Sequence, residues 1–142
     1  SPSSELPRVR LASIALRQHD VTNAIKWSQQ ALTLAPNSVD AHYLLGRASL
    51  EAGDVTTALR ELETASKLSP ASPEIHFNLA KAYARAKMTE KAQYERDTFL
   101  RLNQAAESQR NNQDSHVYLG TRNAGDVNTA SPLQTPPTPQ RP

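Results

Sequence analysis

Cysteine is absent from the 142-residue sequence, which excludes disulfide frameworks, thiolate metal sites and a cysteine nucleophile. Glycine is scarce, and no string resembles a glycine-rich phosphate loop, a paired-histidine zinc motif or a Ser/His/Asp set. No apolar run approaches the roughly 20 residues that span a bilayer. We therefore predict a soluble chain without catalytic site, cofactor, metal or membrane span. The sequence leaves the compartment open, whether bacterial cytoplasm or periplasm.

An excess of one charge is also lacking. The 16 basic and 14 acidic side chains are well mixed, and no dense Lys/Arg patch indicates nucleic-acid binding. Apolar residues make up 37%, below the usual share of a globular domain, so we expect part of the chain to stay outside a core. The sequence begins Ser1-Pro2, without an initiator Met or signal peptide, which predicts that it is part of a longer protein.

A repeat of 34 residues organises the first hundred positions. Pro2, Pro36 and Pro70 are equally spaced, and the string 20–22 recurs at 54–56. The same register aligns leucines and alanines, namely Leu11 with Leu45 and Leu79, and Ala24 with Ala58 and Ala92. Internal repetition of this length is typical of stacked helical units.

Each unit contains the pattern of two helices, most clearly in the second. Ser38 can cap a first helix, Gly53 can end it in the left-handed conformation, and Asp54 can cap a second helix that stops before Pro70. Ser72 and Pro73 predict a cap and a first-turn proline in the third unit. The predicted helices lie near 5–17, 21–34, 38–51, 55–68, 72–86 and 89–108.

Small residues recur in the middle of the first helices, at Ala12, Gly46 and Ala80. Two antiparallel helices can approach closely only where their side chains are short. A large residue at Gly46 is therefore expected to force the helices apart.

The second unit resembles the tetratricopeptide repeat family. The family pattern of a large residue, Leu-Gly, Tyr, Ala, an apolar residue, Ala and a closing Pro falls on His42, Leu45-Gly46, Ser49, Ala58, Leu62, Ala65 and Pro70. Ser28 and Arg96 depart from the apolar position in the outer units, and Gln104 replaces the last Pro. The resemblance implies an all-α fold, an α-solenoid of three helix-turn-helix repeats. Its first helices would line a concave groove that receives a peptide or helix of a partner protein.

The repeats are predicted to occupy residues 1–108, divided as 5–38, 39–72 and 73–108. Because Pro2 holds the closing position of a repeat, we expect further repeats before it, and the unpartnered first helix is expected to expose apolar surface that could mediate self-association. Residues 109–142 are polar and Pro-rich, which predicts a disordered tail with a polyproline II stretch at 135–139. Residues 117–119 form its apolar cluster, either solvated or weakly docked on the repeats.

The family's groove positions give the candidate binding residues. The resemblance places Tyr43, Arg47, Phe77, Asn78, Lys81 and Arg85 there, with Leu50, Glu51 and Glu74 beside them and Val9, Ser13 and Arg17 as the first-repeat counterparts. An aromatic row beside a basic row suits an extended peptide with an apolar residue and a carboxylate. One binding mode of the family is a clamp of Lys, Asn and Arg that grips a chaperone's terminal carboxylate. Its positions fall here on Val9, Ser13, Leu44, Glu74 and Asn78, of which only the Asn is suitable, so that clamp is absent.

His42 and His76 share the register and could lie near each other, but two histidines without a third ligand make a poor metal site. They and Trp27 are interpreted as packing residues.

Three hypotheses remain open from the sequence. The leading one is a non-catalytic protein-interaction module. The second is a recognition or dimerisation arm of a larger enzyme or signalling protein whose catalytic domain lies N-terminal. The third is a structural role through self-association of the first helix.

Overall fold

The computed structural model describes the backbone of residues 4–125 and the side chains of residues 4–117. In this range the chain forms six helices and no strand. They are α1 (Leu6–Arg17), α2 (Val21–Leu34), α3 (Val39–Glu51), α4 (Val55–Leu68), α5 (Pro73–Arg85) and α6 (Thr89–Gly125). The first five agree with the predicted spans to within about one residue at each end, which is the usual uncertainty of a helix boundary. Pro2 and residues 135–139 lie outside the described part.

The turn between the two helices of a repeat has the same backbone at all three places. Gly53 has a φ of 85°, and the residues one period away, His19 and Lys87, have φ values of 58° and 60°. This left-handed conformation ends a helix and is easiest for glycine. It closes the turn by aiming the amide of Asp54 at the carbonyl of Ser49, 2.9 Å away. Only the glycine was predicted, because non-glycine residues rarely adopt this conformation.

Side-chain caps begin three of the helices. Those at Ser38 and Asp54 were predicted, and Asp20 caps α2 in the same way as Asp54 caps α4. The Asp20 and Asp54 carboxylates accept the backbone N–H of Asn23 and Thr57, at 3.3 and 3.1 Å, and the Ser38 hydroxyl accepts that of Ala41 at 3.3 Å. These bonds satisfy amides that have no partner inside the helix. Ser72 precedes α5 at the expected position, but its hydroxyl donates to the Glu74 carboxylate instead of capping the backbone.

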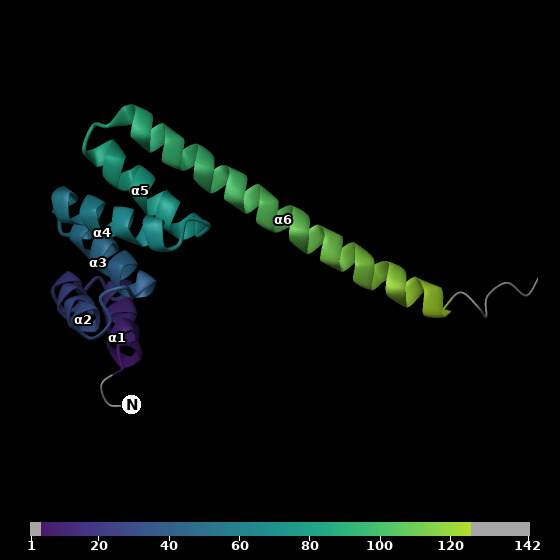
Figure 1. Ribbon diagram of the computed structural model, residues 1–142, viewed down its shortest axis with the longest axis horizontal. Coiled ribbons are helices and arrows are strands. Elements are labelled where there is room, and N and C mark those ends of the chain that lie inside the picture. The colour runs from purple at the N-terminus through teal and green to yellow at the C-terminus, as the bar shows by residue number, and fades with distance from the viewer. Residues whose placement is uncertain (1–3, 126–142) are drawn as a thin grey trace, which may run out of the picture. The chain divides into compact units, whose positions relative to one another are not determined.

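Residues 1–104 form one compact unit. In it, each helix from α1 to α5 packs on the next in sequence, and α1 also contacts α3 as α3 contacts α5 (Figure 1). First helices therefore lie beside first helices, as in a solenoid. The close approaches use fully buried small residues, among them Ala12, Ala24 and Ala58.

The core consists of two apolar clusters that share the partly buried ring of Tyr43. One cluster joins α1 and α2 to α3, and the other joins α3 and α4 to α5 and the start of α6. Trp27 packs against the first cluster as expected. Because Tyr43 contacts both, the residue that faces the groove also helps to join neighbouring repeats.

The first helix exposes apolar surface, as predicted. Leu11 is 41% exposed, whereas its counterparts Leu45 and Leu79 are 4% and 1% exposed under the preceding repeat. Leu6 and Ile14 add to this face at 58% and 42%. Self-association through it stays a prediction.

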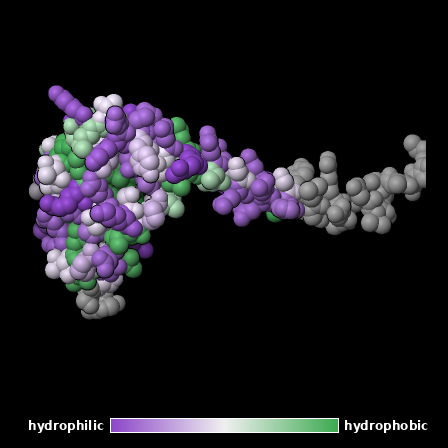
Figure 2. Space-filling model, turned by 45° about the horizontal axis from the view of Figure 1, so that its top comes forward, coloured by the Kyte–Doolittle hydropathy of each residue, from purple (hydrophilic) through white to green (hydrophobic). Residues whose placement is uncertain are grey.

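The last helix is longer than predicted. We expected it to end near residue 108, with disorder from 109, but α6 extends to Gly125. The described residues after Gln104 belong to a second unit, and the side chains of residues 105–117 are exposed and mostly hydrophilic (Figure 2). A helix satisfies its backbone internally, and adding a residue to an existing helix costs far less than nucleating one, so a polar segment without proline can continue it. Val117 is exposed there, and the side chains of residues 118 and 119 lie outside the described part.

Within the part of the chain that the structure describes, no helix is both long and apolar enough to cross a membrane.

Candidate functional site: a groove between α3 and α5

The six predicted groove residues lie together. A groove of about 450 Å³ runs along the first helices of the second and third repeats. It is lined by Tyr43, Arg47, Leu50 and Glu51 of α3, by Glu74, Phe77, Asn78, Lys81 and Arg85 of α5, and by Phe99 of α6. The first-repeat positions Val9, Ser13 and Arg17 do not line it. That the groove binds a partner remains a prediction.

The helices α3 and α5 each contribute a cation stacked on an aromatic ring. The Arg47 guanidinium lies 5.5 Å from the centre of the Tyr43 ring, and the Lys81 ammonium lies 5.6 Å from the centre of the Phe77 ring. Both pairs are four residues apart on one helix face, the spacing at which side chains meet. Because the pairs are one repeat apart, the groove presents the same combination twice.

Asn78 fixes the tyrosine of this groove. Its buried amide group donates to the Tyr43 hydroxyl at 3.1 Å and to the backbone oxygen of Glu74 at 2.9 Å. Burial raises the pKa of Tyr43 because the phenolate would lose hydration, and the nearby Arg47 charge offsets part of this. The tyrosine therefore stays a neutral phenol at physiological pH. The hydrogen bond from Asn78 to Tyr43 thus links the third repeat to the second.

The other charged residues of the groove already have partners. Arg85 donates to the backbone oxygen of Leu50 at 2.6 Å, which ties α5 to the end of α3. Glu51 pairs with His19 at 2.8 Å, and Glu74 accepts the hydroxyl of Ser72. Arg47 and Lys81 form no salt bridge with a described carboxylate. Their charges face solvent and are available to a ligand.

Phe99 is the groove residue that the sequence analysis did not select. Its ring centre lies 5.3 Å from that of Phe77 at a tilt of 48°, a favourable aromatic contact. The counterparts of Phe99 in the earlier repeats are Ala31 and Ala65, both fully buried. A large residue at a position that is elsewhere small is the signal that could have revealed it. Phe77 remains 46% exposed, so the contact leaves apolar surface open.

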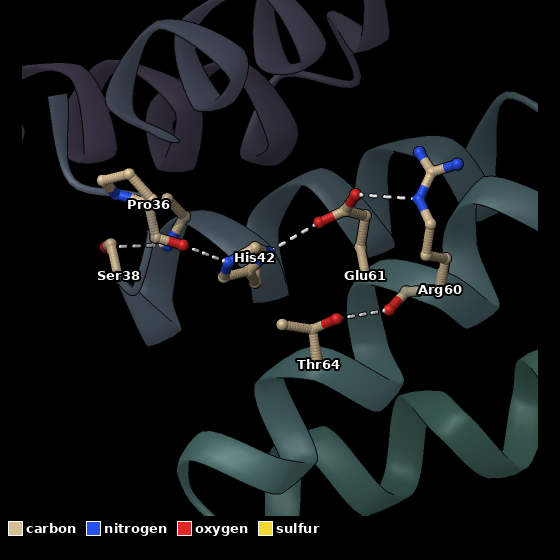
Figure 3. Close-up of polar contacts among 7 residues, drawn as sticks. Pro36, Ser38, His42, Arg60, Glu61 and Thr64 are labelled. Atoms are coloured by element: carbon tan, nitrogen blue, oxygen red, sulfur yellow. Dashed lines mark hydrogen bonds and ion pairs between the residues drawn. The ribbon is translucent and has the colours of Figure 1, made fainter. Parts of the chain in front are cut away.

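The two histidines do not face each other; each closes a buried link within its own repeat. His42 Nδ1 lies 2.6 Å from a Glu61 carboxylate oxygen, and Nε2 lies 2.7 Å from the backbone oxygen of Pro36 (Figure 3). Arg60 donates to the other Glu61 oxygen at 3.3 Å. A carbonyl only accepts, so the nitrogen facing Pro36 must donate, while the other shares a proton with the carboxylate. This link joins the inter-repeat turn, the first helix and the second helix.

The third repeat has the same link. His76 contacts the Glu95 carboxylate at 2.5 Å and the backbone oxygen of Pro70 at 2.6 Å. The first repeat has Arg8 and Trp27 at these places and cannot form it. In the described residues no group of three or more His, Asp or Glu side chains is arranged to hold a metal ion. We interpret the histidines as structural.

Repeated helix pairs whose first helices form a groove define an α-solenoid, a class whose concave surfaces are used for binding other proteins. Residues 15–65 match the family model described as tetratricopeptide repeat, and residues 46–86 match one described as TPR repeat. The chain therefore belongs to the tetratricopeptide repeat family. No curated protein matches the sequence.

Solved structures with the same fold include crystal structures of MamA. One is 19% identical with a TM-score of 0.68, over 76% of this chain and 63% of that one. The second TPR of Spaghetti, bound to an HSP90 peptide, is 12% identical with a TM-score of 0.67, over 70% and 92% of the two chains. At these identities the likeness shows the fold alone.

A mutant of the Thermobaculum terrenum O-GlcNAc transferase is 26% identical with a TM-score of 0.67. The match covers 69% of this chain but 19% of that one. The chain thus spans about three fifths of the MamA chain and about one fifth of the transferase.

Proposed function

We propose that this protein is a non-catalytic interaction scaffold that binds a peptide or helix of a partner protein in the groove between α3 and α5. The observation that supports this most directly is the pair of solvent-facing cations, Arg47 and Lys81, each beside an aromatic ring in one groove. An aromatic ring with an adjacent cation contacts both parts of a ligand that is apolar and acidic.

The charges of the groove favour an acidic ligand. Three cations line it against two carboxylates, Glu51 and Glu74, and both carboxylates are already engaged by neighbouring residues. Arg85 is partly occupied by Leu50, whereas Arg47 and Lys81 are not paired with a described acid. Ligand carboxylates would therefore gain charge-assisted hydrogen bonds without displacing an existing salt bridge.

The test compares two double variants in affinity capture of partners, identified and quantified by mass spectrometry. Arg47→Ala with Lys81→Ala removes the free groove cations, and Lys26→Ala with Lys67→Ala removes two exposed cations outside the groove. We expect the first to lose a partner that the second retains, with equal helical circular dichroism. Equal retention by both variants contradicts groove binding, and equal loss indicates a net-charge effect.

A second candidate, that the repeats are the recognition arm of a larger enzyme, is favoured by the match to the transferase. In that case the catalytic domain would lie N-terminal to residues 1–104 in the same polypeptide. Determining the full reading frame around this sequence tests it. An adjoining catalytic domain would support the arm, and a frame with repeats alone would contradict it.

A further inference from the structure

We infer that the groove recognises two acidic side chains three residues apart on a peptide in the polyproline II conformation, an inference that rests on the proposed groove binding. It starts from the repetition of the cation–aromatic pair. Tyr43 with Arg47 and Phe77 with Lys81 occupy the same register on α3 and α5, whereas α1 has Val9 and Ser13 there. A ligand in the groove therefore contacts two cation–aromatic pairs, and the described repeats offer no third.

The distance between the two pairs sets the spacing of the ligand. The helices α3 and α5 contact each other, and packed helices lie about 8–10 Å apart. A polyproline II peptide turns once every three residues and rises about 3.1 Å per residue, so positions i and i+3 face the same side about 9 Å apart. In a β-strand, same-side residues at i and i+2 are only about 7 Å apart. The extended left-handed form thus matches one acid to each cation.

The aromatic surface of the groove favours an apolar residue next to one of the acids. Phe77 is 46% exposed and its ring contacts Phe99, so an aromatic surface lies open in the groove beside Lys81. Proline-rich peptides in the polyproline II form dock on aromatic grooves because they lose little entropy on binding. The preferred ligand is therefore acidic–x–x–acidic, with proline or another apolar residue next to the acid that meets Lys81.

The test uses fluorescein-labelled synthetic peptides with a proline-rich background and two glutamates. The glutamates are placed two, three or five residues apart at constant composition, and a helix-forming peptide has them seven apart. Binding to the full chain is followed by fluorescence anisotropy at low and physiological salt. We expect the spacing of three to bind about fivefold more tightly than the others, the factor of one partly exposed ion pair.

Variants assign the preference to the two cations. Arg47→Ala and Lys81→Ala should each reduce the affinity for the three-spaced peptide to that of a one-glutamate peptide. Lys26→Ala is the matched control, because Lys26 is stacked on Trp27 at 5.2 Å outside the groove. It should leave the preference unchanged.

Equal affinity for all spacings, tighter binding of the helical peptide, or no peptide binding would each overturn the inference. An equal loss in Lys26→Ala would do the same. If the spacing preference fails but the groove double variant still loses its captured partner, the proposed function stands and only the ligand motif is wrong. If neither the peptide binding nor the partner capture depends on Arg47 and Lys81, both proposals are wrong.

Discussion

Gly46 is the position where adding a single methyl group should most directly affect the stability of the protein. A Cβ atom there would lie 2.6 Å from Cγ and 2.9 Å from Cδ2 of Leu62, and 3.3 Å from its backbone nitrogen. Leu62 is fully buried, so its side chain cannot move into solvent. The close atom is the branch point of the side chain rather than its tip, so relief requires α4 to shift. Gly46→Ala should therefore strain the contact between α3 and α4.

Two opposing effects set the magnitude. Replacing a helical glycine by alanine stabilises a helix by about 1 kcal/mol. Adding a methyl group to a filled core costs about 1–3 kcal/mol. Because the clash involves both side chain and backbone of Leu62, we expect overpacking to win, with a net loss of about 1 kcal/mol in the free energy of unfolding. Urea unfolding followed by helical circular dichroism measures it.

Two further variants separate packing from helix propensity. Ala80→Gly makes the reverse change at the equivalent position of α5. It should also destabilise the protein, by about 1 kcal/mol, because glycine has the lower helix propensity. Leu62→Ser in the Gly46→Ala background reproduces the Ala12 and Ser28 combination of the first repeat. Leu62→Ser should cost less there than in the wild type, since it also removes the clash. A Gly46→Ala variant more stable than the wild type would refute the reasoning.

Three other expectations follow from single contacts. His76→Ala should cost about 3–5 kcal/mol in urea unfolding because it leaves the buried Glu95 carboxylate without its partner, and replacing both residues by leucine should recover part of the loss; an additive double variant would contradict this. Burial, with a hydrogen bond to a carboxylate, raises the pKa of Tyr83 above its ordinary 10.0, so its contribution to stability is complete below that pH and is lost as the pH rises beyond it. Tyr83→Phe should therefore lose less stability than the wild type between about pH 8 and about pH 11, and an equal loss would count against this. If α1 mediates self-association, the mass from light scattering should rise with concentration and Leu11→Gln should abolish the rise; a constant monomer mass excludes it.

The 34-residue period of the sequence predicts most of the fold because the signals for helix caps and turns recur at the same positions of successive repeats. The cap at Asp54 and the left-handed Gly53 fix one turn, and the register places the cap Asp20 at the same point of the first repeat. The left-handed backbone of Lys87 was not predicted. The extent of α6 could not be predicted this way. Its residues 105–117 are exposed, so neither periodicity nor burial in this stretch marks where a polar helix ends.

The positions of the groove residues could be predicted because the family resemblance assigns them to the first helices, and they line one groove on α3 and α5. The histidine links could not be predicted from local pattern, because Glu61 lies 19 residues from His42 on another helix. A signal was nevertheless present. His42 and His76 are one period apart, and so are Glu61 and Glu95. When two polar residues recur together in successive repeats among apolar positions, the pattern predicts that they form a hydrogen bond or ion pair with each other.

The proposed binding site depends on the differences between the repeats. Identical units would stack equally well, and the core positions do repeat almost unchanged, as at Ala24 and Ala58. Some groove residues, such as Tyr43 and Asn78, also join neighbouring repeats, but the exposed cations Arg47 and Lys81 form no such link. Where the second and third repeats have a cation on an aromatic ring, the first has Val9 and Ser13, so the chemistry for a ligand is confined to α3 and α5. In the proposed binding mode, helix packing therefore sets the distance between the two cation–aromatic pairs, and the exposed residues of each repeat decide whether it carries such a pair.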